Sequence, residues 1–192
     1  MLGNVINREI VGSNPFYMVI EGTEAGLLKR WDVLKRIKEL QQFIQTLPGI
    51  TSSLSLVDYL ELLETGLNKV GEQDLEVDEQ GNLVPAKAKT FWEDPKNLDP
   101  LLKIVTTTPE TFKSVVTADF GKASILVRTN LSGSHGIEGT LQKIREYIET
   151  HMPPDMPVRL TGNLVLLTGT TSDIVAGQVE SLGLALGIIF VV

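Results

Sequence analysis

The sequence contains no cysteine and few residues suited to acid–base or metal chemistry. Without thiols, disulfide bonds, thiolate metal sites and cysteine nucleophiles are all excluded. The two histidines, His135 and His151, lie in a Gly/Ser-rich turn and at a predicted helix end, and neither has a partner at a metal-ligand spacing. We therefore expect no metal, no cofactor and no catalytic residue, and we interpret the protein as a non-enzyme.

Basic residues are in the minority. Lys and Arg number 17 against 24 Asp and Glu, which gives a formal net charge of -7, and no basic stripe runs along the chain. Because nucleic-acid binding needs clustered Lys and Arg to contact phosphates, we expect no nucleic-acid partner. The sequence also lacks the glycine-rich patterns that bind nucleotide phosphates. Its N-terminus lacks the basic head and apolar core of a secretory signal.

Carboxylates recur on one predicted helix at Asp58, Glu61 and Glu64. A spacing of three residues brings them to one side of the helix. Such a row is usually a solvated surface and only occasionally a cation site. A soluble enzyme that uses dispersed carboxylates stays open as an alternative, and it predicts an acidic pair with perturbed pKa values inside a cleft.

The first third of the chain alternates between strand and helix patterns. Residues 16–20 are a compact apolar run, which predicts a buried strand. Apolar residues recur every three or four positions over 31–47, which predicts an amphipathic helix. A second strand is expected over 50–56 and a second helix over 57–70.

Residues 71–99 change character, because they are acidic and interrupted by prolines such as Pro85 and Pro95. We interpret this stretch as a solvated connection, and a connection of this length is commonly functional or disordered. Phe91 and Trp92 lie within it. As exposed aromatics they would cover a groove or touch a partner; alternatively, they anchor the connection to the body of the domain.

Regular structure is expected to resume in the second half. Residues 114–118 and 122–129 predict a hairpin around Gly121. A helix over 137–152 and a strand over 157–162 complete the pattern.

The second half thus repeats the strand-helix-strand order of the first. We expect an α+β fold in which two ferredoxin-like strand-helix-strand units form a helix-on-sheet sandwich. Two separate small domains are the alternative. The expected divisions are a first strand-helix-strand unit (1–70), an acidic, proline-containing connection (71–110), a second strand-helix-strand unit (111–162) and a C-terminal helix running into the start of a transmembrane helix (163–192).

The C-terminal stretch ends in an apolar run. From Leu182 to Val192 every residue is apolar or glycine, 11 in a row. A transmembrane helix needs about 20 apolar residues, so this run is roughly half of one. We expect a long helix from Asn163 that leads into a truncated transmembrane segment. A buried C-terminal helix or strand of a soluble domain is the alternative.

Several segments together carry a resemblance to a known family. They are GSNPFYMVIEG (12–22), VLKRIKELQQFIQTLPGITSSLSLVDYL (33–60), DFGKASILVR (119–128) and LTGNLVLL (160–167), the last followed by GQVESLGLALGIIFVV (177–192). In order and texture they resemble the first large extracytoplasmic loop of exporters of the resistance-nodulation-division superfamily. The resemblance is narrower to the hydrophobe/amphiphile efflux branch, close to the mycobacterial-membrane-protein-large-like (MMPL-like) lipid exporters.

This resemblance implies the periplasmic or extracytoplasmic porter domain of a proton-driven exporter of hydrophobic or amphiphilic, lipid-like molecules in the bacterial inner membrane. The domain would form the substrate path, an apolar cleft between the two units, without transducing energy itself, and Phe91 and Trp92 would be substrate-path or lid residues. Expected partners are the transmembrane part of the same exporter, the membrane, a lipid or small amphiphile, and further copies of the protein. A stand-alone soluble ligand-binding or protein-interaction module with a ferredoxin-like fold is the alternative.

Overall fold

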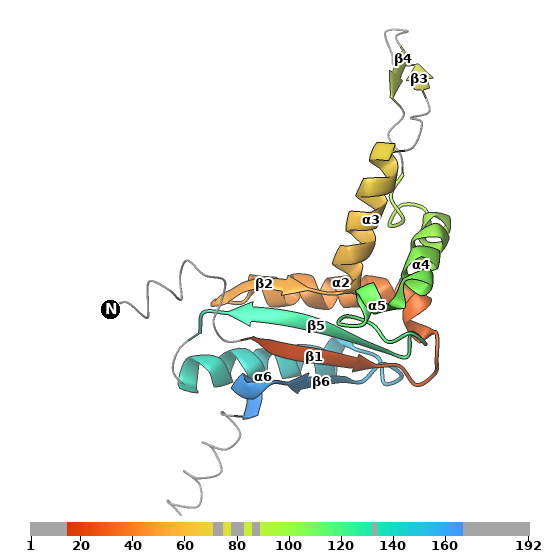
Figure 1. Ribbon diagram of the computed structural model, residues 1–192. Helices are drawn as coiled ribbons and strands as arrows, with labels where there is room; N and C mark the ends of the chain where they lie inside the picture. Colours follow the sequence, from red (N-terminus) through yellow and green to blue (C-terminus); the bar gives the residue numbers. More distant parts are fainter. Residues whose placement is uncertain (1–14, 71–74, 78–82, 86–88, 132–133, 167–192) are drawn as a thin grey trace, which may run out of the picture.

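The described part of the chain is built on a four-stranded antiparallel sheet with two long helices across one face (Figure 1). The computed structural model describes residues 15–70, 75–77, 83–85, 89–131 and 134–166. The strand order is β2-β5-β1-β6. The strands are β1 (Phe16–Glu21), β2 (Ile50–Leu54), β5 (Lys122–Thr129) and β6 (Val158–Thr161), and the helices are α2 (Trp31–Thr46) and α6 (Ser134–His151).

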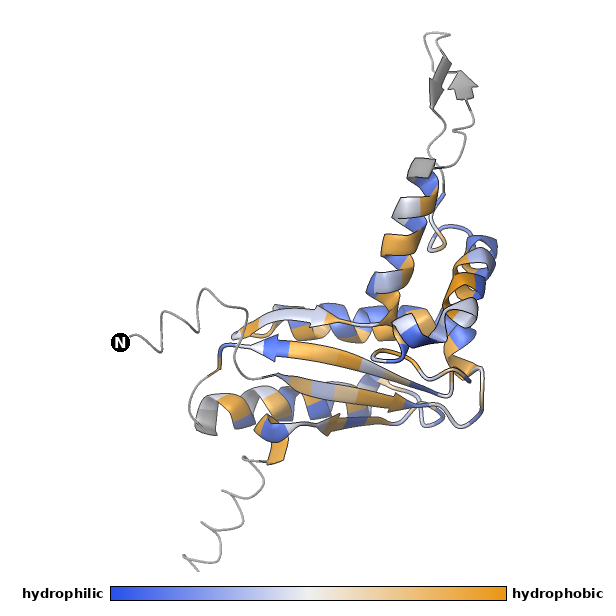
Figure 2. Ribbon diagram, in the orientation of Figure 1, coloured by the Kyte–Doolittle hydropathy of each residue, from blue (hydrophilic) through white to orange (hydrophobic). Residues whose placement is uncertain are grey.

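The core lies between the sheet and these two helices. In β1 the side chains of Phe16, Met18 and Ile20 are fully buried, as the two-residue period of a half-covered strand requires. Apolar residues at every third or fourth position of α2 and α6 pack against these side chains. On the opposite sheet face Tyr17 is 41% exposed. Figure 2 shows apolar residues along much of β5 and a hydrophilic stretch at its arrowhead.

The two strand-helix-strand units, β1-α2-β2 and β5-α6-β6, interleave in this sheet. β1 lies between β5 and β6, and it pairs with β5 from Phe16 opposite Val127 to Glu21 opposite Lys122. The α+β prediction with helices on a sheet is therefore confirmed, and the alternative of two separate small domains is wrong. Because the units share backbone hydrogen bonds across β1 and β5, no cleft separates their strands among the described residues, and an apolar cleft elsewhere between the units stays a prediction.

The residues between β2 and β5 form a helical insertion rather than a plain connection. α3 (Leu56–Val70) extends away from the sheet, and α4 (Leu98–Thr107) lies beside it (Figure 1). A short hairpin of β3 (Leu75–Val77) and β4 (Leu83–Pro85) lies beyond the far end of α3. The remaining short helices are η1 (Leu27–Lys29), η2 (Pro95–Asn97) and α5 (Pro109–Phe112).

The expected first arm of the hairpin around Gly121 is reduced to one bridge, between Val116 and Ala123. The reason is the position of β5 inside the sheet. β2 occupies one edge of β5 only as far as Leu54 opposite Leu126, where the chain turns away into α3. The segment around Val116 contacts the short length of β5 that β2 leaves uncovered.

The C-terminal part of the prediction falls largely outside the described residues. Asn163 to Leu166 are helical and follow β6 directly. The remainder of the expected helix, and the apolar run from Leu182, lie outside the described residues. Within the ranges given above, no helix is both long enough and apolar enough to cross a membrane.

Candidate functional site between α3 and α4

The row of carboxylates on α3 connects this helix to its surroundings instead of facing solvent. Asp58, the first of the row, receives hydrogen bonds from the backbone N–H of Ser55 and from the Gln41 side chain, both at 2.7 Å. The Ser55 hydroxyl donates in turn to the Gln41 carbonyl at 2.8 Å. Asp58 therefore caps the amino end of α3 and fixes it against α2.

Glu61, one turn later, joins α3 to two other segments. Its carboxylate pairs with the Lys38 ammonium of α2 at 2.8 Å. It also accepts a hydrogen bond from the Trp92 indole N–H at 2.9 Å. Both partners neutralise or satisfy the carboxylate, so Glu61 is a structural group rather than a free ligand.

Glu64, the last of the row, is the most deeply buried of the three acids. Its side chain is 8% exposed, and one oxygen, Oε1, accepts the Phe91 backbone N–H at 2.6 Å. Burial raises the pKa of Glu64 above its ordinary value, and the neighbouring charges of Glu61 and Glu93 act in the same direction, while the Phe91 N–H opposes them. The residues described provide no hydrogen bond to the second oxygen, Oε2.

Phe91 and Trp92 lie against this face of α3. Phe91 is fully buried, and its carbonyl accepts the Trp31 indole N–H at 2.8 Å. The Trp92 ring is half-buried, 6.3 Å from the Trp31 ring in an edge-on arrangement. The expectation of two exposed aromatics is therefore wrong for Phe91, because α3 and Trp31 hold it from both sides. The alternative interpretation, an anchor for the connection, describes this geometry.

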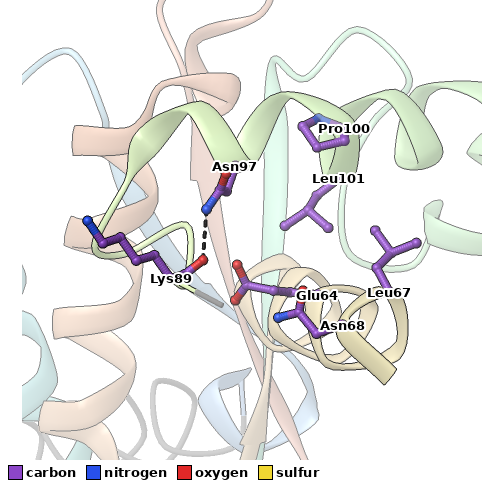
Figure 3. A pocket seen from close by; sticks show the side chains of 7 residues that line it. All are labelled: Glu64, Leu67, Asn68, Lys89, Asn97, Pro100 and Leu101. Carbon is purple, nitrogen blue, oxygen red and sulfur yellow. Dashed lines mark hydrogen bonds between the residues drawn. The ribbon is translucent and has the colours of Figure 1, made fainter. Parts of the chain in front are cut away.

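A cavity of about 330 Å³ opens next to Glu64, between α3 and the first turn of α4. Figure 3 shows the Glu64 carboxylate directed into this space, with Leu67 and Leu101 to one side of it. On the other side the Asn97 amide donates to the Lys89 carbonyl at 2.7 Å, which closes the rim. The lining residues are Glu64, Leu67, Asn68, Lys89, Asn97, Pro100 and Leu101.

This arrangement provides groups that can bind a ligand. It offers one buried carboxylate, two amides and an apolar wall, and among the described residues no three His, Cys, Asp or Glu side chains gather as a metal site would require. Of the histidines, His151 stacks on Tyr147 with ring centroids 4.1 Å apart, at the end of α6. The side chain of His135 falls outside what the structure describes.

Sequence reasoning found the carboxylate row but missed the pocket. Glu64, Leu67 and Asn68 share a helix face by spacing alone, which predicts nothing about burial. The opposite wall comes from the segment around Lys89 and from α4, and no local pattern indicates that these residues return to α3. No family model matches this sequence, and a search of curated proteins found no match either.

We expect Glu64→Gln to raise the free energy of unfolding relative to the unchanged chain, and we expect this difference to grow as the pH rises. A carboxyl whose folded-state pKa lies above its unfolded value of 4.5 binds its proton more tightly in the folded protein. The free energy of unfolding therefore falls as the pH rises from that value through the folded-state pKa, and glutamine removes this loss while keeping an oxygen for the Phe91 N–H. Urea unfolding of both proteins between about pH 4 and pH 8 measures the difference.

The control is Asp119→Asn, for which the opposite trend is expected. The Thr117 hydroxyl and then the Gly121 N–H lower the pKa of Asp119 below its ordinary value of 3.8. The stability from its ionised form is present above that value and is lost as the pH falls through the folded-state pKa, so Asp119→Asn costs more at neutral pH than in acid. A pH-independent difference for Glu64→Gln would contradict the burial of its charge.

Proposed function

We propose that this chain is the extracytoplasmic porter domain of a proton-driven exporter of hydrophobic or amphiphilic molecules, of the resistance-nodulation-division type. One observation carries the proposal: within the described residues, the segments that resemble this family lie together on one sheet and the helices next to it, while 177–192 lies outside these residues. They contain β1, most of α2 with β2, most of β5, and the end of β6 with the helical turn that follows. Segments separated widely in the sequence thus belong to one structural unit, as a shared fold requires.

The connectivity supports the same proposal. Without the insertion the chain runs β1-α2-β2-β5-α6-β6, and the sheet order β6-β1-β5-β2 with all neighbours antiparallel is that of a ferredoxin-like split β-α-β fold. We infer this fold family for the chain. Its uncovered sheet face, which includes the exposed Tyr17, would contact another part of the exporter or a further copy of the protein.

The exit from β6 supports a mechanical link between the sheet and the membrane. Gly162 follows β6 with a φ of 119°, a conformation that favours glycine, and the next residues begin a helix. A Cβ at this position would lie 3.1 Å from the Phe16 Cα of β1. In the proposed exporter this tight junction would transmit movement between the sheet and the segment that contains the apolar run 182–192.

Deletion of the complete gene tests the proposal. Cells without it are expected to retain more of a hydrophobic dye such as Nile red, because extrusion is lost. The complete gene should restore extrusion only while the proton gradient is intact, because the proposed exporter is driven by protons and its porter domain transduces no energy itself. Dye retention is read by fluorescence with and without a protonophore.

The reading frame on both sides of the chain separates the proposal from its alternative. A porter domain predicts about 10 further apolar residues after Val192 and a separate spanning segment before the chain. Unchanged dye retention, together with a frame that has neither feature, would leave the stand-alone binding or interaction module as the better function.

A further inference from the structure

We infer that the cavity between α3 and α4 binds a primary ammonium group that carries a short apolar chain, with Glu64 as its counter-ion. As a substrate-entry site the cavity rests on the proposed exporter function, whereas the binding itself rests on the geometry of the described residues. The carboxylate is the only ionised acceptor among the residues that line the cavity.

The first argument is the unused oxygen of Glu64. Oε1 is held by the Phe91 N–H, which fixes the orientation of the carboxylate, and Oε2 receives no hydrogen bond from the described residues. Because the Glu64 side chain is 8% exposed, its charge is largely removed from water, and an opposite charge beside it offsets that cost. An ammonium ion supplies both the opposite charge and a hydrogen-bond donor.

The second argument is the sign of the local charge. Glu61 and Glu93 both act on Glu64 as negative neighbours. Lys89 contributes to the rim, yet Figure 3 shows its ammonium end directed away from Glu64. The amino end of α4 carries a partial positive charge, and Asp99 in its first turn offsets it. A cation is therefore favoured here, and a phosphate-bearing head group is disfavoured.

The third argument is the wall beside the carboxylate. Leu67, Pro100 and Leu101 provide apolar surface for a hydrocarbon chain, while the Asn68 amide provides a further acceptor near Glu64 (Figure 3). The volume of about 330 Å³ is at the lower end of the range of small-molecule sites, about 300–1,000 Å³. The cavity fits an amine with a few carbons, and the rest of a longer chain would extend past Leu67, which is 44% exposed.

Titration of the 192-residue chain with n-hexylammonium chloride tests this inference. Binding is followed by calorimetry and by the amide chemical shifts of Glu64, Leu67 and Asn68 in NMR. Hexan-1-ol, which has the same chain without the charge, and hexyltrimethylammonium, which has the charge without an N–H donor, serve as matched ligands. Both are expected to bind at least about tenfold more weakly, because the charge-assisted hydrogen bond is lost.

Two variants measure separately what the carboxylate and the apolar wall contribute to binding. Glu64→Gln keeps the hydrogen bond to Phe91 and is expected to weaken hexylammonium binding about 10- to 100-fold. Leu67→Ala removes part of an exposed wall and should weaken it a few-fold. The control is Glu110→Gln, the same change at a surface carboxylate paired with Lys113, and it should bind as the unchanged chain does. Circular dichroism verifies that each variant is folded.

The inference is overturned if hexan-1-ol binds as tightly as hexylammonium, if Glu64→Gln retains full affinity, or if the shifts map outside the α3–α4 pocket. The export measurement is independent of this one. If the chain binds the amine selectively and dye retention is unchanged in the deletion strain, the binding site is supported and the exporter function is contradicted. If extrusion is lost in the deletion strain but the chain does not bind the amine, the exporter function is supported and the binding site is contradicted.

Discussion

Replacing Phe91 by alanine is expected to lower the free energy of unfolding by about 3–5 kcal/mol, the range found for large buried aromatics. Phe91 is fully buried, and its backbone is held by Trp31 on one side and Glu64 on the other. Truncation leaves a cavity at the point where the segment before α4 is fixed to α3. The consequence is loss of anchoring for the wall of the pocket.

Two optical probes report this loss separately. The sequence contains two tryptophans, Trp31 and Trp92, and both belong to the anchor. Tryptophan fluorescence therefore reports the anchor, whereas far-ultraviolet circular dichroism reports the whole fold. We expect fluorescence of the Phe91→Ala protein to change at lower urea concentration than the circular dichroism, because local detachment precedes global unfolding.

The control is Leu62→Ala on the same helix. Leu62 is 67% exposed, so its truncation should change stability by no more than about 0.5 kcal/mol. A surface lid would behave differently from an anchor, since its removal affects binding and leaves stability nearly unchanged. Equal stability of Phe91→Ala and Leu62→Ala would therefore favour the lid and contradict the anchor.

Gly162→Ala is expected to have the second largest effect, a loss of about 2–3 kcal/mol in the free energy of unfolding. Two costs combine in this variant. An L-residue is strained at a φ of 119°, and its Cβ would be forced to within 3.1 Å of the Phe16 backbone, which cannot move without disturbing the pairing of β1.

Gly26→Ala separates these two costs. Gly26 also has a positive φ, 83°, but an added Cβ there meets no atom within 4 Å. Gly26→Ala therefore measures the backbone strain alone, which is about 1–2 kcal/mol. Urea unfolding of both variants gives the difference, and an equal loss would show that the contact with β1 has no energetic consequence. In the proposed exporter, Gly162→Ala should also reduce dye extrusion, because it alters the junction after β6.

The regular elements were largely predictable from the sequence. The compact apolar run over 16–20 and the three-to-four periodicity over 31–47 predicted β1 and α2 with boundaries close to those observed, and the strand after 157 and the helix before it were predicted equally well. Local periodicity is sufficient here because each element must present one apolar face to the core. The absence of cysteine chemistry was also determined by the sequence alone.

The candidate site could not be predicted in the same way. Glu64 looks like Asp58 and Glu61 in a helical projection, yet only Glu64 borders a cavity with an unused oxygen. Its burial depends on Phe91, which is 27 residues away in the sequence. Because the segment between them has no simple period, sequence patterns gave no reason to bring its aromatic residues back to α3.

The sequence by itself determined the strands β1 and β6, the helices α2 and α6 and, for these helices, which face is apolar. Only the tertiary structure decided that β1 lies between β5 and β6, that α4 covers α3, and that Phe91 is inside. The physical reason is the range of the interactions. Periodicity arises from neighbours a few residues apart, whereas strand order and pocket walls depend on contacts between distant residues, such as Trp31 and Phe91, 60 positions apart.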